Sequence, residues 1–285
     1  MGITAATKTV FTGLTLTATL TGTPVAFADQ PVQTPAQKEM AALLNVYKQQ
    51  LEKNTDSLTG FDLATAADNI TKIGKHCGTL ATPAINLLAK IDNISSIEGL
   101  GEVAAQCPEA AKKTMGLIAS FEKGHSHPSP EIKNWERRAV AVAAVNIAVN
   151  YDDAGLDDSA MSILEKTTDI FANDTNKLAS SDSSVVNVHG AFGVEYDDWP
   201  AENKVGLMSA GEEIANSLTN LGMRSTPMAA RAHFALGKME AALKKAPRAT
   251  SVISLLNKIE SSQERLNQYL QTIPAGPERK NICPS

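Results

Sequence analysis

Apolar residues recur every three to four positions along most of this chain, and this spacing constrains its fold more than any other feature. An amphipathic α-helix needs such spacing, whereas a half-buried β-strand needs strict alternation. About nine or ten such stretches follow one another between residues 35 and 273, separated by short breaks. Aromatic residues make up only 5% of the chain, which disfavours a β-sandwich, because strands are enriched in aromatic and β-branched side chains. We therefore predict an all-α fold, either a multi-helix bundle or a short α-superhelix.

Breaks in the helical pattern predict how the chain is divided. The segment 124–130 is rich in Gly, Ser and Pro and is the clearest internal break. We predict an N-terminal helical subdomain over 29–123, a C-terminal helical subdomain over 131–273, and a polar tail over 274–285. The glycines of 91–101 predict a linker, followed by one helix from about 102 to 121 that starts late or kinks at Pro108.

Residues that favour helix N-termini predict where several helices begin. Thr34 and Thr226 each precede a proline, which is favoured in the first helical turn. Either Asp157 or Asp158 is predicted to supply the N-cap and a first-turn acid for a helix that starts near Gly155.

The first 28 residues have the layout of a secretory signal peptide. Lys8 precedes an uncharged run that ends in Ala26-Phe27-Ala28, with small residues before the predicted cleavage site. The alternative is an uncleaved membrane anchor, because a run of about 20 residues can span a bilayer. Its many threonines, two glycines and Pro24 make that run weakly apolar. We expect cleavage after Ala28, a periplasmic or secreted location, and no stable membrane insertion of the soluble mature chain.

The charge of the chain argues against nucleic acid as a partner. Removing residues 1–28 takes away one lysine and no acidic residue, so the formal charge changes from −5 to −6. Binding to nucleic acid needs clustered Lys and Arg to neutralise phosphates. We therefore expect no nucleic-acid binding.

The three cysteines predict a disulfide, because an exported protein meets an oxidising environment. Cys77 and Cys107 are closest in sequence, and we predict that they pair; Cys283 would then be left over, although it could instead reach either of the others. The loop closed by Cys77–Cys107 would stabilise the fold by about 3–4 kcal/mol. The absence of a C-x-x-C motif argues against a thioredoxin-like redox site, a zinc knuckle and c-type haem attachment.

Residues 144–172 resemble a tetratricopeptide helix pair. Ala148, Tyr151, Gly155, Ala160 and Leu164 match the small, aromatic, turn and large apolar positions of that motif. The resemblance implies two antiparallel helices that approach closely over their small residues. An ordinary helical hairpin explains the same residues, because a shift of about 34 residues in either direction finds no second copy.

The segment 183–203 is the best candidate site in the sequence, because it lacks a helical period. Valines on both sides of a Gly-containing turn predict an irregular or β-hairpin-like insertion near 183–202. Long non-helical segments in helical proteins are often functional. The alternative is a folded loop whose Phe192 and Trp199 only fill the core. The residues that could bind a ligand here are His189, Glu195, Tyr196, Asp197, Asp198 and Trp199.

Three functions remain open from the sequence. The first is a protein- or peptide-interaction module of the cell envelope, with a protein or peptide as partner. The second is a small-ligand or metal-binding protein that uses His189, Glu195 and Asp197 or Asp198. The third is an envelope hydrolase or lyase, with Glu195 and Asp198 as acid and base. The sequence lacks a zinc-binding H-E-x-x-H, a nucleophile elbow and a complete calcium loop, so we assign no catalytic residue, no metal and no cofactor, and we favour a non-enzymatic role.

Overall fold

A computed structural model describes residues 33–53, 60–91, 93–124, 130–180, 201–246 and 248–273. Within these ranges the chain forms ten α-helices and one short 3-10 helix, which confirms the predicted all-α fold of about nine or ten helices. The helices are α1 (Pro35–Lys53), α2 (Gly60–Gly74), α3 (Ala81–Leu88), α4 (Ile94–Gln106), α5 (Pro108–Gly124), α6 (Pro130–Val149), α7 (Ala154–Ser180), α8 (Ala201–Gly222), α9 (Thr226–Leu243) and α10 (Thr250–Thr272).

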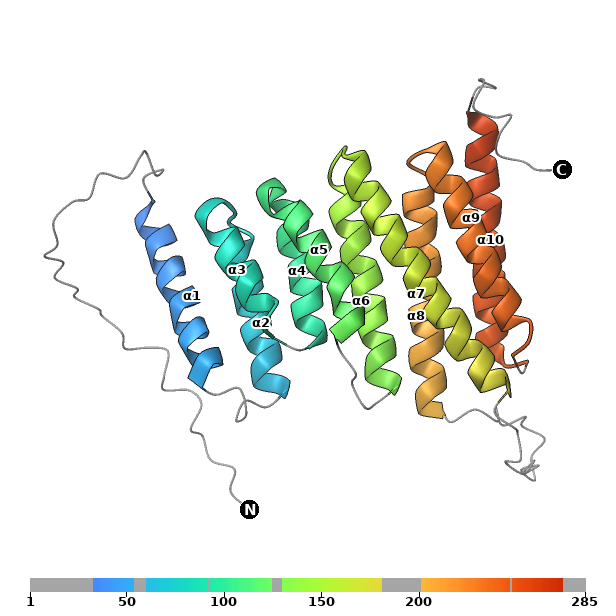
Figure 1. The fold of residues 1–285 in the computed structure, drawn as a ribbon, viewed down its shortest axis with the longest axis horizontal. Helices are drawn as coiled ribbons and strands as arrows, with labels where there is room; N and C mark the ends of the chain where they lie inside the picture. The colour runs from blue at the N-terminus through green and yellow to red at the C-terminus, as the bar shows by residue number, and fades with distance from the viewer. Residues whose placement is uncertain are drawn as a thin grey trace, which may run out of the picture.

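The helices form an extended double layer in which chain order is also spatial order, from α1 at one end to α10 at the other (Figure 1). In one layer α2, α4, α6, α8 and α10 pack each against the next. In the other layer α3, α5, α7 and α9 follow one another, and each helix packs on its sequence neighbour across the layers.

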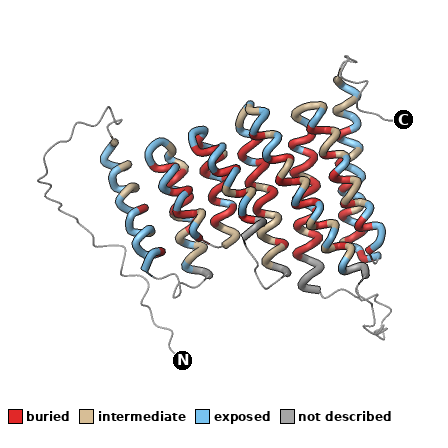
Figure 2. The backbone as a smooth tube through the Cα atoms, in the orientation of Figure 1, coloured by how far each residue is buried: buried red, intermediate tan, exposed pale blue. Residues whose placement is uncertain are grey.

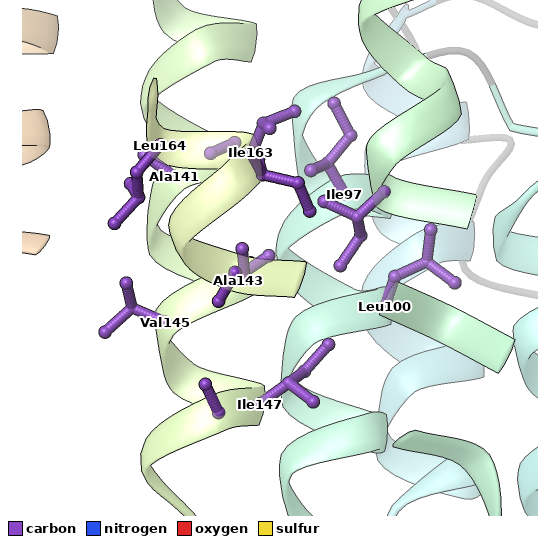
Figure 3. Packing of buried hydrophobic residues seen from close by; sticks show 14 of the residues in the cluster. Ile97, Leu100, Ala141, Ala143, Val145, Ile147, Ile163 and Leu164 are labelled. Carbon is purple, nitrogen blue, oxygen red and sulfur yellow. The ribbon is translucent and has the colours of Figure 1, made fainter. Parts of the chain in front are cut away.

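The hydrophobic core lies between the two layers, and buried residues run through every helix from α2 to α10 (Figure 2). Helix α6 lies at its centre, in contact with α4, α5, α7 and α8. Between Ala139 and Ala148 only Val142 and Asn146 are not buried. Figure 3 shows the side chains of Ala143 and Ile147 on α6 beside Leu100 of α4, with Ile163 of α7 in the same part of the core. Alanine suits this position because small side chains allow close packing of helices on several sides.

The predicted linker over 91–101 is wrong, because most of it belongs to α4. Asn93 caps this helix by accepting a hydrogen bond of 2.8 Å from the Ser96 backbone N–H. Its glycines lie inside the helix, at contacts with other helices. A Cβ atom on Gly101 would lie 2.7 Å from both the Cα and the Cβ of Ala143. Glycine here permits the close approach of α4 and α6 and does not break the helix.

The predicted helix starts are confirmed at some positions and wrong at others. Thr34 caps α1, because its hydroxyl accepts from the Gln37 N–H at 3.2 Å while the Gln37 side chain accepts from the Thr34 N–H at 2.9 Å. At α9 the cap is Ser225, one residue before the predicted Thr226.

Helix α7 is capped by Asp153, whose carboxylate accepts from the Gly155 N–H at 2.8 Å. Asp157 lies in the first turn of α7, as predicted, but is not the cap. Pro108 starts a separate helix, so the single helix predicted over 102–121 is two helices, α4 and α5.

The turns between successive helix pairs are joined along one edge of the double layer. The predicted Cys77–Cys107 disulfide is present and joins the turn after α2 to the turn after α4. The Tyr151 hydroxyl, in the turn after α6, donates to the Ala104 carbonyl of α4 at 2.6 Å. Arg224, in the turn after α8, donates to the Tyr151 carbonyl at 2.7 Å. These links hold neighbouring helix pairs in a fixed relation to one another.

The two predicted subdomains stay a prediction. Helices α4 and α6 pack directly on each other across the 124–130 break, and one buried cluster includes residues from both sides. Among the helices of the described ranges, none has both the length and the apolar character needed to cross a bilayer.

Candidate functional site

All the ligand-binding residues predicted from the sequence lie outside the described residues. The segment 181–200, between α7 and α8, is not among the described residues. Residues 1–32 and 274–285 also lie outside the described ranges. The roles assigned to this loop, the signal peptide and the state of Cys283 therefore stay predictions. The loop residues concerned are His189, Glu195, Tyr196, Asp197, Asp198 and Trp199.

The structure contains a candidate site that the sequence did not reveal, an open groove between α5 and α7. Its volume is about 610 Å³, which lies within the usual range of about 300–1,000 Å³ for ligand pockets. We call it the α5–α7 groove. Its lining residues are Lys112, Met115, Gly116 and Ala119 of α5 with Gly155, Leu156, Asp158, Ser159, Ser162, Ile163 and Lys166 of α7.

Small residues leave the space that forms the groove. Gly155, Ser159 and Ser162 recur along one side of α7, and Gly116 faces them from α5. A Cβ atom built on Gly116 would have no heavy atom within 4 Å. Helices α5 and α7 make few contacts with each other, whereas α7 and α9 in the same layer pack closely. The groove is therefore a local gap in the layer.

The floor of the groove is apolar, and the two serine hydroxyls of its α7 wall donate to carbonyls of the same helix. Met115, Leu156 and Ile163 are buried to at least 96% and form the floor. The Ser159 hydroxyl donates to the Gly155 carbonyl at 2.7 Å, and the Ser162 hydroxyl donates to the Asp158 carbonyl at 2.9 Å. A ligand would therefore find apolar contact area in the floor, and the Ser159 hydroxyl oxygen keeps the capacity to accept a hydrogen bond.

The length of the groove limits what can lie in it. On α5 it extends from Lys112 to Ala119, and on α7 from Gly155 to Lys166. At about 1.5 Å per helical residue these stretches measure about 10 and 16 Å. The groove can therefore accommodate two to three turns of a helix or about five extended residues.

Two lysines flank the groove. The Lys112 ammonium lies 3.0 Å from the Asp153 carboxylate, and its side chain is 78% exposed. This contact lowers the pKa of Asp153, because hydrogen bonding to the Lys112 ammonium stabilises the charged carboxylate. Lys166 is exposed and has no polar partner in the part of the chain that the structure describes.

Three acidic residues of α7, Asp158, Glu165 and Asp169, are bound to cations of α9. Arg231 makes two hydrogen bonds of 2.8 Å to Glu165 and one of 3.0 Å to Asp158. Lys238 donates to Asp169 at 2.7 Å. The pKa of Arg231 is raised, chiefly by its hydrogen bonds to Glu165. Asp158 and Glu165 share one guanidinium, so these contacts balance only part of the acidic charge of α7.

A metal site is not supported at the one group of potential ligands that lie together among the described residues. Cys77, Cys107 and Glu109 lie within ligand distance of one another. Both sulfurs are used in the disulfide and cannot act as thiolates. The Glu109 carboxylate accepts from the Gly78 N–H at 2.7 Å, which is a structural role.

Sequence reasoning missed the α5–α7 groove because its residues carry no recognisable chemistry. The available signal was a row of small residues along one face of α7, Gly155, Ser159 and the half-buried Ser162, with Gly116 on another helix. Comparisons with family models, with curated proteins and with solved structures give no match for this chain.

Proposed function

We propose that this protein is an exported interaction module that binds a peptide segment of a partner protein in the α5–α7 groove. The observation that carries the proposal is the groove itself, with an apolar floor between two helices whose small facing residues leave space unfilled. An apolar groove between helices is a recurrent site for amphipathic partner segments. The α5–α7 groove is open to solvent, so a partner segment can reach its floor.

Two independent features support export. Residues 1–28 have the layout of a cleaved signal peptide, and disulfides such as Cys77–Cys107 persist in oxidising compartments. Intact-mass analysis of protein recovered from the envelope or medium tests this part. We expect a chain that begins at Asp29, and a chain retained in the cytosol with residues 1–28 intact would contradict it.

The tetratricopeptide-like residues support the same role, because they pack the helical hairpin, α6 and α7, that carries one wall of the groove. Ala148 and Ala160 are both fully buried, and Leu164 lies in the core beside them. We propose that this local resemblance reflects a helical hairpin, α6 and α7, that serves as a binding scaffold. Gly155, the turn residue of the resemblance, lines the groove itself.

Filling the groove at Gly116 tests the proposal. Because no atom lies within 4 Å of a Cβ there, Gly116→Leu fills the groove without a clash at that atom. Gly237→Leu on α9 is the matched control, since Gly237 also has no atom within 4 Å of a Cβ and does not line the groove. Both changes remove a helical glycine, so their effects on stability should be similar.

The assay is selection of peptides from a random phage-displayed library on the mature protein, followed by fluorescence anisotropy with the recovered peptides. We expect binding to wild type and to Gly237→Leu with similar affinity, and binding to Gly116→Leu weakened at least about tenfold, equivalent to about 1.4 kcal/mol. Equal binding to all three proteins, or recovery of no peptide, would refute the proposed site.

A further inference from the structure

We propose that this protein forms a weak twofold dimer in which α1 of one copy packs antiparallel on α1 of a second copy. This inference goes beyond the proposed function and does not depend on the α5–α7 groove. It rests on a regular stripe of exposed residues on α1, on the position of that stripe at the end of the double layer, and on its complementarity to itself.

Six exposed residues lie along one side of α1 at alternating spacings of three and four. They are Ala36, Glu39, Leu43, Val46, Gln50 and Lys53. We call them the α1 stripe. This spacing is the heptad spacing of helices that pair along a common seam. Leu43 and Val46, at its centre, are 42% and 47% exposed, and of the large hydrophobic residues exposed in the described ranges these two alone lie within one helical turn of each other.

The α1 stripe faces away from the rest of the double layer. Helix α1 lies at one end of the array (Figure 1) and is exposed along most of its length (Figure 2). The Glu52 carboxylate lies 3.7 Å from the Lys90 ammonium, just after α3, so Glu52 is on the side of α1 that faces α3. Leu43 is nine residues from Glu52, or two and a half helical turns. Leu43 therefore lies on the opposite side, and no helix of the described ranges covers it.

The other end of the double layer has a different surface. Among the exposed residues of α10, all except Ile253 are polar or charged. Terminal helices of extended arrays need such a polar outer face to remain soluble, and α10 has one. A head-to-tail contact would bury these polar groups against Leu43 and Val46 without partners, which is unfavourable. A contact of α1 with α1 avoids this cost and is isologous, the usual form of a twofold dimer.

The spacing of the α1 stripe makes its apolar centre complementary to itself. The spacings are symmetric about the midpoint between Leu43 and Val46. A twofold axis at this midpoint places Leu43 of each copy against Val46 of the other. The next position outward on either side places Glu39 against Gln50, and the amide of Gln50 can donate to the carboxylate.

The charges of the α1 stripe are also complementary in this arrangement. Lys53 lies opposite Ala36, whose small side chain leaves room for the lysine, and one helical turn from Glu39 of the second copy. Neither Glu39 nor Lys53 has an ion-pair partner in the part of the chain that the structure describes. The other charged residues of α1 lie outside the α1 stripe, so no like charges meet along the seam; they are Lys38, Lys48 and Glu52.

The length of α1 limits the strength of the dimer. The helix has 19 residues and is about 28 Å long at 1.5 Å per residue. A single contact between two such helices lies at the small end of the range for specific interfaces, about 1,200 Å² of total buried surface. We therefore expect a monomer at about 1 μM and a growing fraction of dimer as the concentration approaches about 1 mM.

Sedimentation equilibrium of the mature protein over this concentration range tests the dimer. Leu43→Glu places an unpaired charge in the centre of the seam and should weaken the dimer at least about tenfold. Ile253→Glu is the matched control, because Ile253 is an apolar residue of 47% exposure at the opposite end of the array. Wild type and Ile253→Glu should dimerise with the same dissociation constant.

Reversing the charges tests the antiparallel register. Glu39→Lys and Lys53→Glu each place like charges across the seam, so each variant alone should dimerise about 3- to 10-fold more weakly than wild type. An equimolar mixture of the two variants restores opposite charges at both sites. Fluorescence energy transfer between the labelled variants should therefore show a heterodimer tighter than either homodimer, with a preference that shrinks at high salt.

Four results would overturn the inference. The first is a wild-type protein that stays monomeric at about 1 mM. The second is a dimer that Ile253→Glu weakens as much as Leu43→Glu does. The third is a mixture of the charge variants with no preference for the heterodimer, because the antiparallel register requires one. The fourth is a monomer with a lower melting temperature in Leu43→Glu, which would mean that another segment of the same chain covers the α1 stripe.

Discussion

The contact between α4 and α6 allows a sharp test of how this chain packs. Gly101 lies at a close approach of the two helices, and a Cβ atom there would lie 2.7 Å from the Cα and Cβ of Ala143. We expect Gly101→Ala to destabilise the protein, even though alanine is a better helix former than glycine. The conflict between these two effects makes the sign of the result informative.

The magnitude follows from the distance. Carbon atoms in favourable contact are about 3.5–4.0 Å apart, so the helices must separate by about 1 Å to admit the new methyl group. Separation on this scale forfeits a quarter to a half of the attraction of each affected contact, and overpacking of this kind costs about 1–3 kcal/mol. Removing a helical glycine returns about 0.5–1 kcal/mol. Because the clash involves backbone atoms of α6, which cannot rotate away, we expect a net loss of about 1–2 kcal/mol.

Gly116→Ala provides the control, because it makes the same chemical change in a helix where the new methyl group meets no atom within 4 Å. We expect Gly116→Ala to stabilise the protein by about 0.5–1 kcal/mol. Urea unfolding followed by far-UV circular dichroism measures both variants, and thermal melts should move in opposite directions by several degrees. A Gly101→Ala protein at least as stable as wild type would refute the close approach of α4 and α6.

Three further predictions concern covalent and ionic contacts. Replacing Cys77 and Cys107 together by alanine should lower the free energy of unfolding by about 3–4 kcal/mol, because the 30-residue separation sets the loop entropy; a loss under about 1 kcal/mol in urea unfolding would contradict this. Arg231→Met should cost about 1 kcal/mol, discounted for partial exposure, and Arg231→Lys should recover only part of it, because lysine cannot make the bidentate contact with Glu165. The pKa of Asp153 is lower in the folded protein than in the unfolded chain, so its charged form stabilises the fold above the unfolded pKa. This stabilisation is lost as the pH falls through the folded pKa. Lys112→Met should reduce this loss in urea unfolding measured at several pH values, and an unchanged pH profile would contradict the assignment.

The fold was largely predictable because it depends on local patterns. Helical spacing and the short breaks predicted an all-α chain of about nine or ten helices, and the structure confirms it. Proximity in sequence was enough to pair Cys77 with Cys107. The cap at Thr34 was also predictable, because a hydroxyl and the helix start that it stabilises are only three residues apart.

Glycines show where local reasoning fails. Gly101 and its neighbour Gly99 were interpreted as linker residues, because glycine weakens a helix when it has no other role. Both lie inside α4, where the absence of a Cβ allows other helices to approach. Whether a glycine breaks a helix or permits a contact depends on a partner far away in the sequence, such as Ala143, and no local pattern identifies that partner.

The sequence by itself therefore determined the helices, the disulfide and the predicted export signal, because each depends on residues that are near one another in the chain or on composition. The tertiary structure alone decided which helices share a layer, and with that the α5–α7 groove. Gly116 and Ser159 are 43 positions apart and become opposite walls only because α6 packs between α4 and α8 and holds α5 and α7 on one side. The groove is a space that small residues leave between two helices, so no sequence pattern identifies it before the packing of the helices is known.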